Sequence, residues 1–307
     1  MGGRFRIRPT PCVRPLVHRD VALYPWEHGR IGPPGGRHIL LFHTIWWTLQ
    51  YNWRAQSANV TRTNIQQTYL IYGVTSRIDG EIAPQWVGNH AQDKSFVEFG
   101  DFPLQLGIQV LKGHSESWLS DIRIWVQETF PTGHYNNLSP TTASRTGTGG
   151  GSYATTLGLG AQKASWLTRE HFFRYRVNAA YGFYSPVTVQ GFNSYGGGFG
   201  TTGRVYPGSV TTLAVAGEYT ITRHVALALD ISLQIAEATR FSGTAGVDAS
   251  GNPATLGRGY SELITVAPAM EYNWNQYVGV IAGPWFSLSG RNTSEFFGVV
   301  AALYLYL

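Results

Sequence analysis

The chain has 307 residues, of which 37 are glycine, 14% are aromatic and only 13% are charged, and its formal net charge is +5. That charged fraction is about half of what a typical soluble globular protein carries, so a surface of this composition would be poorly solvated. No apolar run is long enough for an ordinary transmembrane helix, which needs roughly 18 or more residues.

The positive charge is confined to the start of the chain. Residues 1–43 contain seven Arg against Asp20 and Glu27, whereas residues 44–307 hold 16 basic and 16 acidic side chains. A nucleic-acid-binding surface needs a basic face on a folded unit, and residues 44–307 supply no net charge for one. We therefore expect no nucleic-acid partner.

Residues 1–43 are rich in Arg, Pro and Gly, with six Pro and six Gly, so no long helix or strand is expected in them. We expect this segment to be disordered or to reflect a mis-assigned start, because it lacks the basic stretch, apolar run and cleavage site of a signal peptide. The single cysteine, Cys12, gives no disulfide framework. Residues 44–307 are expected to form one domain.

The stretch HVALALDISLQIA, residues 224–236, alternates strictly between two kinds of side chain. Aliphatic residues such as Leu227, Leu229 and Ile231 share one face, while small or polar residues, including Asp230, share the other. A period of two indicates a β-strand, either of a soluble sandwich or of a transmembrane barrel whose aliphatic face meets lipid. One strand cannot decide between them.

The same alternation recurs about twelve times, and most of the segments have the length that a tilted strand needs to cross a bilayer. They are residues 44–54, 66–74, 77–88, 102–112, 117–130, 151–162, 171–184, 209–219, 223–237, 260–272, 276–288 and 295–307.

The lengths of the connections also alternate. Connections after the even-numbered segments are short, as at 76–77, 220–223 and 273–276, whereas those after the odd-numbered segments are mostly long and rich in Gly, Ser, Thr and Asn, as at 131–150 and 185–208. Short periplasmic turns and long extracellular loops are typical of outer-membrane barrels. The sequence thus predicts an all-β fold, a transmembrane antiparallel up-and-down β-barrel of about 12 strands in a bacterial outer membrane.

The face opposite the aliphatic residues carries side chains that lipid would exclude, and we expect it to line the lumen. An Arg facing lipid at mid-bilayer costs about 2–4 kcal/mol, whereas opposite charges inside a barrel can pair. Two interpretations stay open for these residues: they brace the lumen, or they also select a solute. The predicted lumen-lining residues are Asp79, Glu81, Asp121, Arg123, Trp125, Arg174, Arg176, Glu218, Asp230 and Glu271. Trp285 is also expected to point inward and to narrow the path.

Tyr and Trp gather near the predicted strand ends, as expected for the aromatic belts at the two membrane interfaces. The residues assigned to these belts include Tyr219, Tyr272, Trp274, Tyr277, Tyr304 and Tyr306.

Several runs resemble one family. They are YGVTSRID at 72–79, GDFPLQLGIQVL at 100–111, FPTG at 130–133 and SELITVAPAMEYNWNQYVGVIAGPWFSL at 261–288. These runs are similar to the MetA-pathway phenol-degradation outer-membrane proteins, and the resemblance covers about Gln66 to Leu307. It implies an outer-membrane β-barrel that conducts aromatic or other small apolar nutrients. No catalytic or binding residue carries over from the family.

Catalytic motifs are absent from the sequence. The Gly-rich runs TGTGGGSY and SYGGGFGTTG lack the phosphate-binding pattern, no GxSxG elbow occurs, and the nine His are dispersed without HExxH or paired Cys. We expect no catalytic residue, no metal and no cofactor. A lipid hydrolase built from Ser120 or Ser232 with His224 would need a geometry that spacing cannot show.

The leading functional prediction is an outer-membrane channel for small solutes, aromatic or hydrophobic ones included. Eight strands leave room for side chains alone and 16–18 leave a water channel, so twelve predict a narrow path. The alternatives are a surface adhesion barrel acting through its outer loops and, third, the hydrolase. The expected partners are outer-membrane lipid, a small-molecule solute and, through the C-terminal strand, the barrel-assembly machinery.

Overall fold

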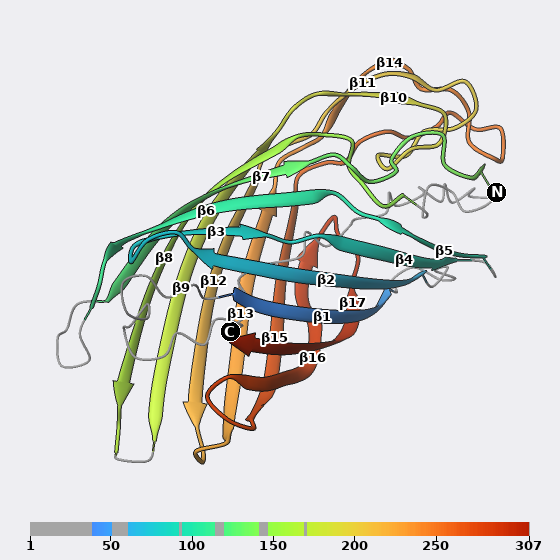
Figure 1. The fold of residues 1–307 in the computed structure, drawn as a ribbon. Helices are drawn as coiled ribbons and strands as arrows, with labels where there is room; N and C mark the ends of the chain where they lie inside the picture. Colours follow the sequence, from blue (N-terminus) through green and yellow to red (C-terminus); the bar gives the residue numbers. More distant parts are fainter. Residues whose placement is uncertain are drawn as a thin grey trace.

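A computed structural model describes residues 39–50, 61–91, 94–113, 120–140, 147–168 and 171–306; for 39–50, 61–62, 90–91 and 94–96 the description is limited to the backbone. Antiparallel strands dominate these residues (Figure 1). Within the same ranges no helix has the length and apolar character to cross a membrane.

The strands in chain order are β1 (Ile39–Gln50), β2 (Thr61–Gly73), β3 (Ile78–Ile82), β4 (Gln85–Ala91), β5 (Lys94–Phe99), β6 (Phe102–Leu111), β7 (Asp121–Phe130), β8 (Ala154–Trp166), β9 (Phe172–Tyr184), β10 (Val187–Gln190), β11 (Thr202–Tyr206), β12 (Val210–Thr220), β13 (Val225–Ala236), β14 (Arg240–Thr244), β15 (Ser261–Asn273), β16 (Val278–Arg291) and β17 (Phe296–Tyr306).

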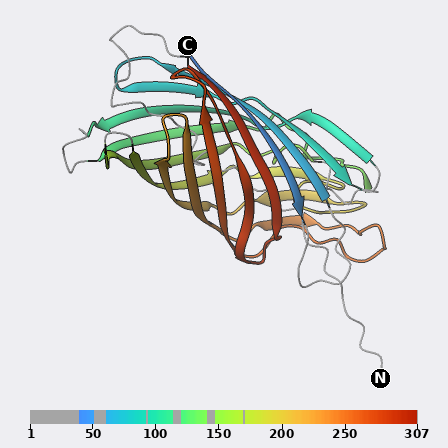
Figure 2. The same cartoon turned by 90° about the horizontal axis from the view of Figure 1, so that it is seen from below.

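The main sheet closes on itself. β1 pairs with β2 along one edge and with β17 along the other, so the first and last strands of the sheet are neighbours. Figure 2 shows the blue strands of the chain start beside the red strands of its end. Closure pairs β1 on both sides and pairs the backbone polar groups along most of the described wall, which is the condition for strands to cross lipid; β5 is paired on one side only, with β4.

The described part of the main sheet has 14 strands, and two of its crossings are each divided in two. β3 and β4 lie end to end, separated by Ala83 and Pro84, and both pair with β2. β5 and β6 also lie end to end, with β5 paired to β4 and β6 paired to β3. Counted as crossings of the wall, the strands number twelve. The predicted fold class and strand number are confirmed.

The lengths of the connections confirm the predicted two-ended organisation. Short turns join β2 to β3, β12 to β13 and β15 to β16 at one end, which we call the short-turn end. The other end, the loop end, carries the long connections from β7 to β8, from β9 to β12 and from β13 to β15. The predicted boundaries are less accurate, since β1 begins at Ile39 rather than at 44. Residues 1–38 of the predicted N-terminal segment, Cys12 among them, lie outside the described residues.

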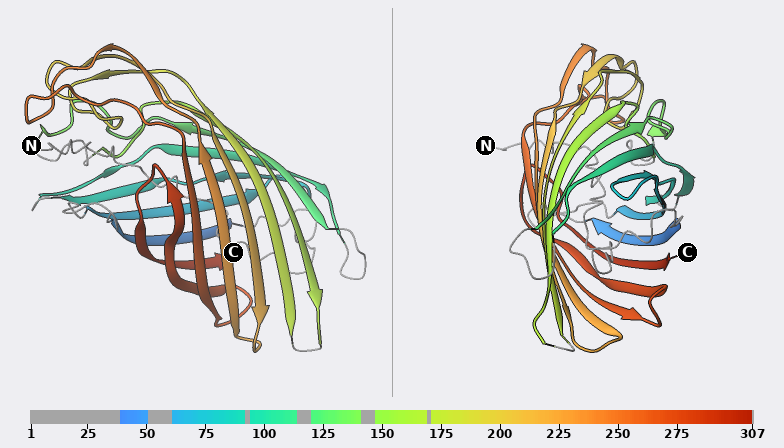
Figure 3. Two further views of the ribbon diagram at one scale, coloured as in Figure 1. Left: turned by 180° about the vertical axis from the view of Figure 1, so that it is seen from behind. Right: turned by 60° about the vertical axis from the view of Figure 1, so that its left-hand side comes forward.

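Two of the long loops contain strands that the sequence did not predict. β10 pairs with β11 and β11 with β14, which makes a three-stranded sheet beyond the loop ends of β9, β12 and β13 (Figures 1 and 3). Val187, Val189 and Val205 are buried in it, against Tyr135 and Phe241. The prediction of long connections at these positions is correct, but part of them forms a small sheet with its own core.

One seam of the wall is interrupted. β15 and β16 pair from Glu262 to Val266, with a register shift after Ile264, and again from Met270 to Asn273, but they are not paired between Val266 and Met270. The register on both sides places Pro268 opposite Pro284, and proline has no N–H to donate to a ladder. The strands stay close, because a Cβ added to Gly283 would meet the Pro268 carbonyl.

Candidate functional site

The two faces of the barrel wall differ in exposure and in chemistry. On β13, Leu227 and Leu229 are 47% and 45% exposed, whereas Ala228 and Asp230, which alternate with them, are buried. On β6, Leu104 and its alternate neighbours are exposed while the glutamines between them are buried. In a closed barrel the buried face is the inner one, so the polar set lines the inside and the aliphatic set forms the outer surface.

By this alternation, each of the ten predicted lumen residues lies on the inner face. Six are buried: Glu81, Arg174, Arg176, Glu218, Asp230 and Glu271. The other four, which are intermediate in exposure, are Asp79, Asp121, Arg123 and Trp125. Their charged members lie between the middle of the wall and the short-turn end. Their part in a solute path stays a prediction.

The inner charges form specific contacts across neighbouring strands. Arg174 of β9 and Glu218 of β12 are direct cross-strand partners, and Arg174 Nη2 lies 2.5 Å from Glu218 Oε2 with both side chains almost fully buried. On the other side of the ring, Gln105 of β6 donates from Nε2 to Oε2 of Glu81, its partner on β3, at 3.4 Å. Such contacts brace the wall and lower the cost of keeping charges away from bulk water.

A second ion pair reaches over an intervening strand. Arg123 of β7 donates to both carboxylate oxygens of Asp79 on β3, although β6 lies between them. The crossing point is Gly107 of β6, which is paired with Asp79, and a Cβ on Gly107 would overlap the Arg123 guanidinium. A glycine in a strand often marks such a close approach. Gly107 therefore makes the Arg123–Asp79 pair possible.

Two other inner-face glycines also lie beneath a side chain of a neighbouring strand. Trp125 is paired with Gly107 on one side and Gly158 on the other, and a Cβ on Gly158 would overlap the indole ring. The ring therefore lies against the wall rather than straight across the interior. Gly279 in β16 likewise lies beneath the ring of its cross-strand partner Tyr304.

Tyr304 lies on the inner face and not in an aromatic belt, where the sequence predicted it. It is 3% exposed and reaches from β17 across β16 to β15, where its hydroxyl contacts Glu271 and Asn273. Asn273 also donates from Nδ2 to Glu271 at 2.9 Å. The alternation in β17 gives the signal that was missed, because it puts Tyr304 on the same face as Val300 and opposite Leu303.

The partly buried Tyr306 packs against the Tyr304 cluster rather than standing in a belt. Tyr219, Tyr272, Trp274 and Tyr277, by contrast, are 38–55% exposed near the short-turn end.

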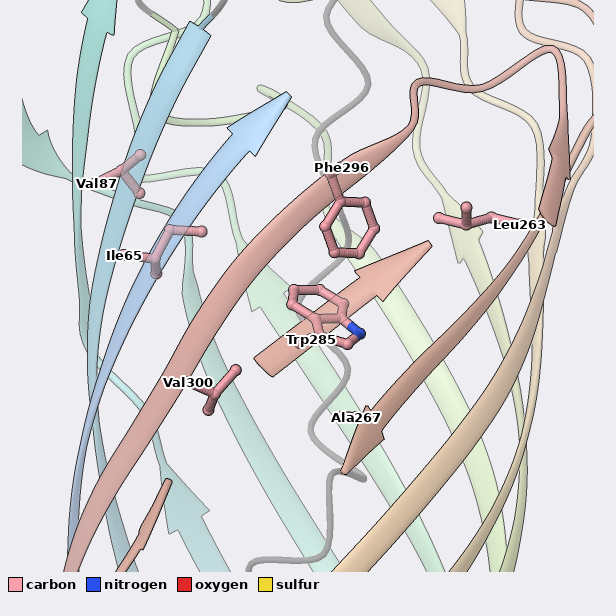
Figure 4. Close-up of a cluster of buried hydrophobic side chains, with 7 residues drawn as sticks. All are labelled: Ile65, Val87, Leu263, Ala267, Trp285, Phe296 and Val300. Carbon is pink, nitrogen blue, oxygen red and sulfur yellow. The ribbon is translucent and has the colours of Figure 1, made fainter. Parts of the chain in front are cut away.

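The inner face also carries an apolar patch, which the sequence analysis did not predict apart from Trp285 (Figure 4). Trp285 is 3% exposed and meets Phe296 edge to face, with the ring centroids 4.5 Å apart. We call this group the inner apolar patch; its members are Ile65, Val87, Leu263, Ala267, Trp285, Phe296 and Val300. It lies between the middle of the wall and the loop end, so the inner face is apolar on one part and charged on another.

The connection between β7 and β8 folds against the inner side of the loop end. Asn89, a buried inner residue of β4, donates to the Gly147 carbonyl, and Thr148, which is fully buried, donates to the Phe99 carbonyl. Asp101 accepts from the N–H groups of Gly133 and Gly150, at 3.0 and 2.7 Å. These contacts hold the Gly-rich run 147–150 against the loop end of the barrel. They account for its position without a phosphate ligand.

The hydrolase geometry is not assembled. Ser232 shares a 2.7 Å hydrogen bond with Thr265 and lies eight residues along the strand from His224, which is about 26 Å. The His224 ring instead contacts the Asn273 carbonyl at the short-turn end and stacks on Tyr272. The Ser120 hydroxyl lies 3.5 Å from that of Tyr175. Neither serine is shown beside the imidazole that would have to activate it.

Comparisons with known proteins agree on architecture. No protein-family model matches the chain, and no curated protein matches its sequence. Among solved structures, the COG4313 outer membrane channel from Pseudomonas putida F1 superposes with a TM-score of 0.63 at 14% identity, covering 93% of this chain and 100% of that one.

Two looser likenesses have TM-scores below 0.5. They are the NanC porin (TM-score 0.42, 10% identity, 87% of this chain and 100% of that one) and the CymD monoaromatic hydrocarbon channel (TM-score 0.39, 8% identity, 88% of each). The likeness to the COG4313 channel shows that the fold is that of an outer-membrane β-barrel.

Proposed function

We propose that this protein is a bacterial outer-membrane channel that lets small solutes, aromatic or other apolar nutrients among them, pass through its lumen. The observation that carries the proposal is the closed twelve-strand wall, with exposed aliphatic side chains outside and charged side chains inside. Such a wall separates lipid on its outside from a polar path on its inside. The COG4313 protein of the same fold is itself an outer membrane channel.

The inner apolar patch supports the choice of solute. Trp285 and Phe296 place two aromatic rings on the inner wall, and aromatic pairs gain about 0.5–1.5 kcal/mol beyond the area they bury. A planar apolar solute that enters from the loop end would meet this patch before the charged short-turn half. The resemblance to the MetA-pathway phenol-degradation proteins points to the same class of solute.

Membrane location is tested first. Outer-membrane fractions are run on gels with and without heating, since a closed barrel resists detergent unfolding and migrates differently before boiling. Outer-membrane lipid and the assembly machinery are the partners that this location implies. Equal mobility of both samples, together with recovery in the soluble fraction, would refute the proposal.

Transport is then measured with full-length protein in liposomes, using uncharged aromatics and sugars. We expect permeability above that of empty liposomes for both, and a selective loss of aromatic flux in W285A. The matched control is F297A, which removes a 41% exposed aromatic from the outer face of the neighbouring strand. Flux no greater than in empty liposomes would argue against a channel, and equal aromatic flux in W285A and F297A would remove the role of the patch.

A further inference from the structure

We propose that the side-chain amide of Gln234 is a specificity-determining group of the lumen, which favours uncharged apolar solutes that carry a hydrogen-bond-accepting oxygen over pure hydrocarbons. This inference rests on the proposed channel function and narrows its class of solute. It starts from one atom. Gln234 Nε2, on β13, is buried and has no hydrogen-bond partner among the described residues.

A buried donor without a partner is unusual in a folded protein. Burial removes the group from water, so the great majority of buried polar side chains gain a partner, and one that lacks it calls for an explanation. Among the described residues, two uncharged side chains keep a buried polar atom without a partner, namely Asn64 and Gln234. Asn64 precedes the buried inner residue Ile65 and therefore falls on the outer face of β2. Gln234 is the one of the two that can meet a solute in the lumen.

Gln234 lies at the edge of the inner apolar patch. By the alternation of β13 it shares the inner face with the buried residues Asp230 and Ala236. Its cross-strand partner on β15 is Leu263, a member of the patch. Directly paired residues of antiparallel strands hold their Cβ atoms about 4.5–5.5 Å apart. The amide is therefore within reach of a solute that lies on Leu263 and extends over the patch.

The amide is free to turn toward such a solute. Ser232, the preceding inner residue of β13, shares its 2.7 Å hydrogen bond with Thr265 of β15 and not with Gln234. Gln234 as a whole is partly exposed, and its amide carries a donor and an acceptor on one plane that rotates about the last side-chain torsion. This rotation would present Nε2 to the lumen, where an oxygen of the solute would supply the missing acceptor.

An unpaired donor beside an apolar surface discriminates between solutes of the same shape. A hydrocarbon on the patch leaves Nε2 without a partner, whereas a solute with a carbonyl or hydroxyl oxygen at that point satisfies it. One neutral hydrogen bond of ordinary net strength corresponds to about fivefold in affinity. The amide should therefore favour oxygen-bearing solutes by about this factor, relative to a wall that lacks it.

The test compares acetophenone with α-methylstyrene, which has a CH2 group in place of the carbonyl oxygen. Binding of each to the full-length protein in detergent micelles is measured by titration calorimetry, with empty micelles as the blank. The variant Q234M keeps an unbranched side chain of similar length and removes the donor. It should weaken the binding of acetophenone about fivefold and leave that of α-methylstyrene unchanged. The matched control is Q66M, the same change at an exposed glutamine on the outer face of β2, which should alter neither affinity.

Stability without solute separates a binding role from a structural one. Because Nε2 has no partner among the described residues, Q234M should not lower the urea midpoint of the barrel. A lower midpoint together with an unchanged affinity for acetophenone would show that the amide braces the wall, directly or through an ordered water, and would overturn the inference. Heat-dependent gel mobility verifies that each variant has closed.

Three further outcomes would also overturn the inference. They are no binding of acetophenone to the wild type, equal weakening of both probes in Q234M, and a change in Q66M as large as that in Q234M. Each of them leaves the channel function standing if the wild type conducts solutes into liposomes. Conversely, a wild type that conducts nothing but distinguishes the two probes through Gln234 would refute the channel and retain the binding group.

Discussion

The outer and inner faces of the barrel are built from alternate residues of the same strands, yet they are specified in different ways. The outer face requires only apolar side chains of ordinary size. Leu229 could therefore be replaced by another aliphatic residue without the loss of a specific side-chain contact. The inner face depends on particular pairs, such as Arg174 with Glu218 and Trp125 with Gly158. Composition is therefore sufficient for the surface that meets lipid, whereas the surface that encloses the path requires specific neighbours.

The largest expected loss of stability comes from removing one half of an inner ion pair. R174Q leaves the Glu218 carboxylate buried without its arginine, which typically costs about 3–5 kcal/mol in the free energy of unfolding. Urea unfolding in lipid vesicles measures the loss. The double variant R174Q/E218Q should recover most of it, and a double variant as unstable as R174Q would contradict this account of the pair.

A charge placed on the outer face is the next largest effect. L229R puts a guanidinium among the aliphatic residues near the middle of β13 and should lower the stability of the inserted barrel by about 2–4 kcal/mol. The control Q234R puts the same side chain on the inner face of the same strand and should cost much less. Equal losses of stability in the two variants would mean that the faces have been assigned wrongly.

A smaller effect tests the close packing inside. G158A adds a methyl group where the Trp125 indole lies, and overpacking of this kind usually costs about 1–3 kcal/mol. On the outer face, G217A should be nearly neutral, since its added Cβ would have no neighbour nearer than Phe173 Cε2 at 3.9 Å. Urea midpoints of the two variants give the comparison, and a neutral G158A would show that the indole does not need that space.

The smallest expected effect concerns one inner hydrogen bond. S232A removes the 2.7 Å bond to Thr265 between β13 and β15 and should cost about 1 kcal/mol. The control S289A changes an exposed serine of β16 and should leave the unfolding midpoint where it is. Loss of lipid hydrolysis in S232A, if the wild type had such activity, would instead support the hydrolase.

The wall could be predicted from the sequence because its signal is local. Alternation with a period of two and connections of alternating length depend on residues close together in the chain, and both fix which face of a strand is which. Asp230 could be placed inside on this basis. The strands β10, β11 and β14 were missed because their stability comes from a core shared among distant loops, and Gly-rich sequence hides it.

The inner contacts could not be predicted, because they depend on register between strands. That Arg123 reaches Asp79, 44 residues away, follows from the alignment of β3, β6 and β7 and from the space above Gly107. The inner apolar patch was missed for another reason: a polar lumen was assumed for the whole barrel. Residues such as Phe296 and Ile65 follow the correct alternation but carry side chains that this assumption excluded.

The lapse in pairing at Pro268 and Pro284 affects how the wall can fluctuate. It divides the pairing between β15 and β16 into two short runs, each with its own backbone hydrogen bonds. A fluctuation that separates these strands can break the hydrogen bonds of one run at a time. In an uninterrupted pairing, the whole length would have to open. We therefore expect backbone fluctuations of the wall to be largest at this gap, in the strand that carries Trp285.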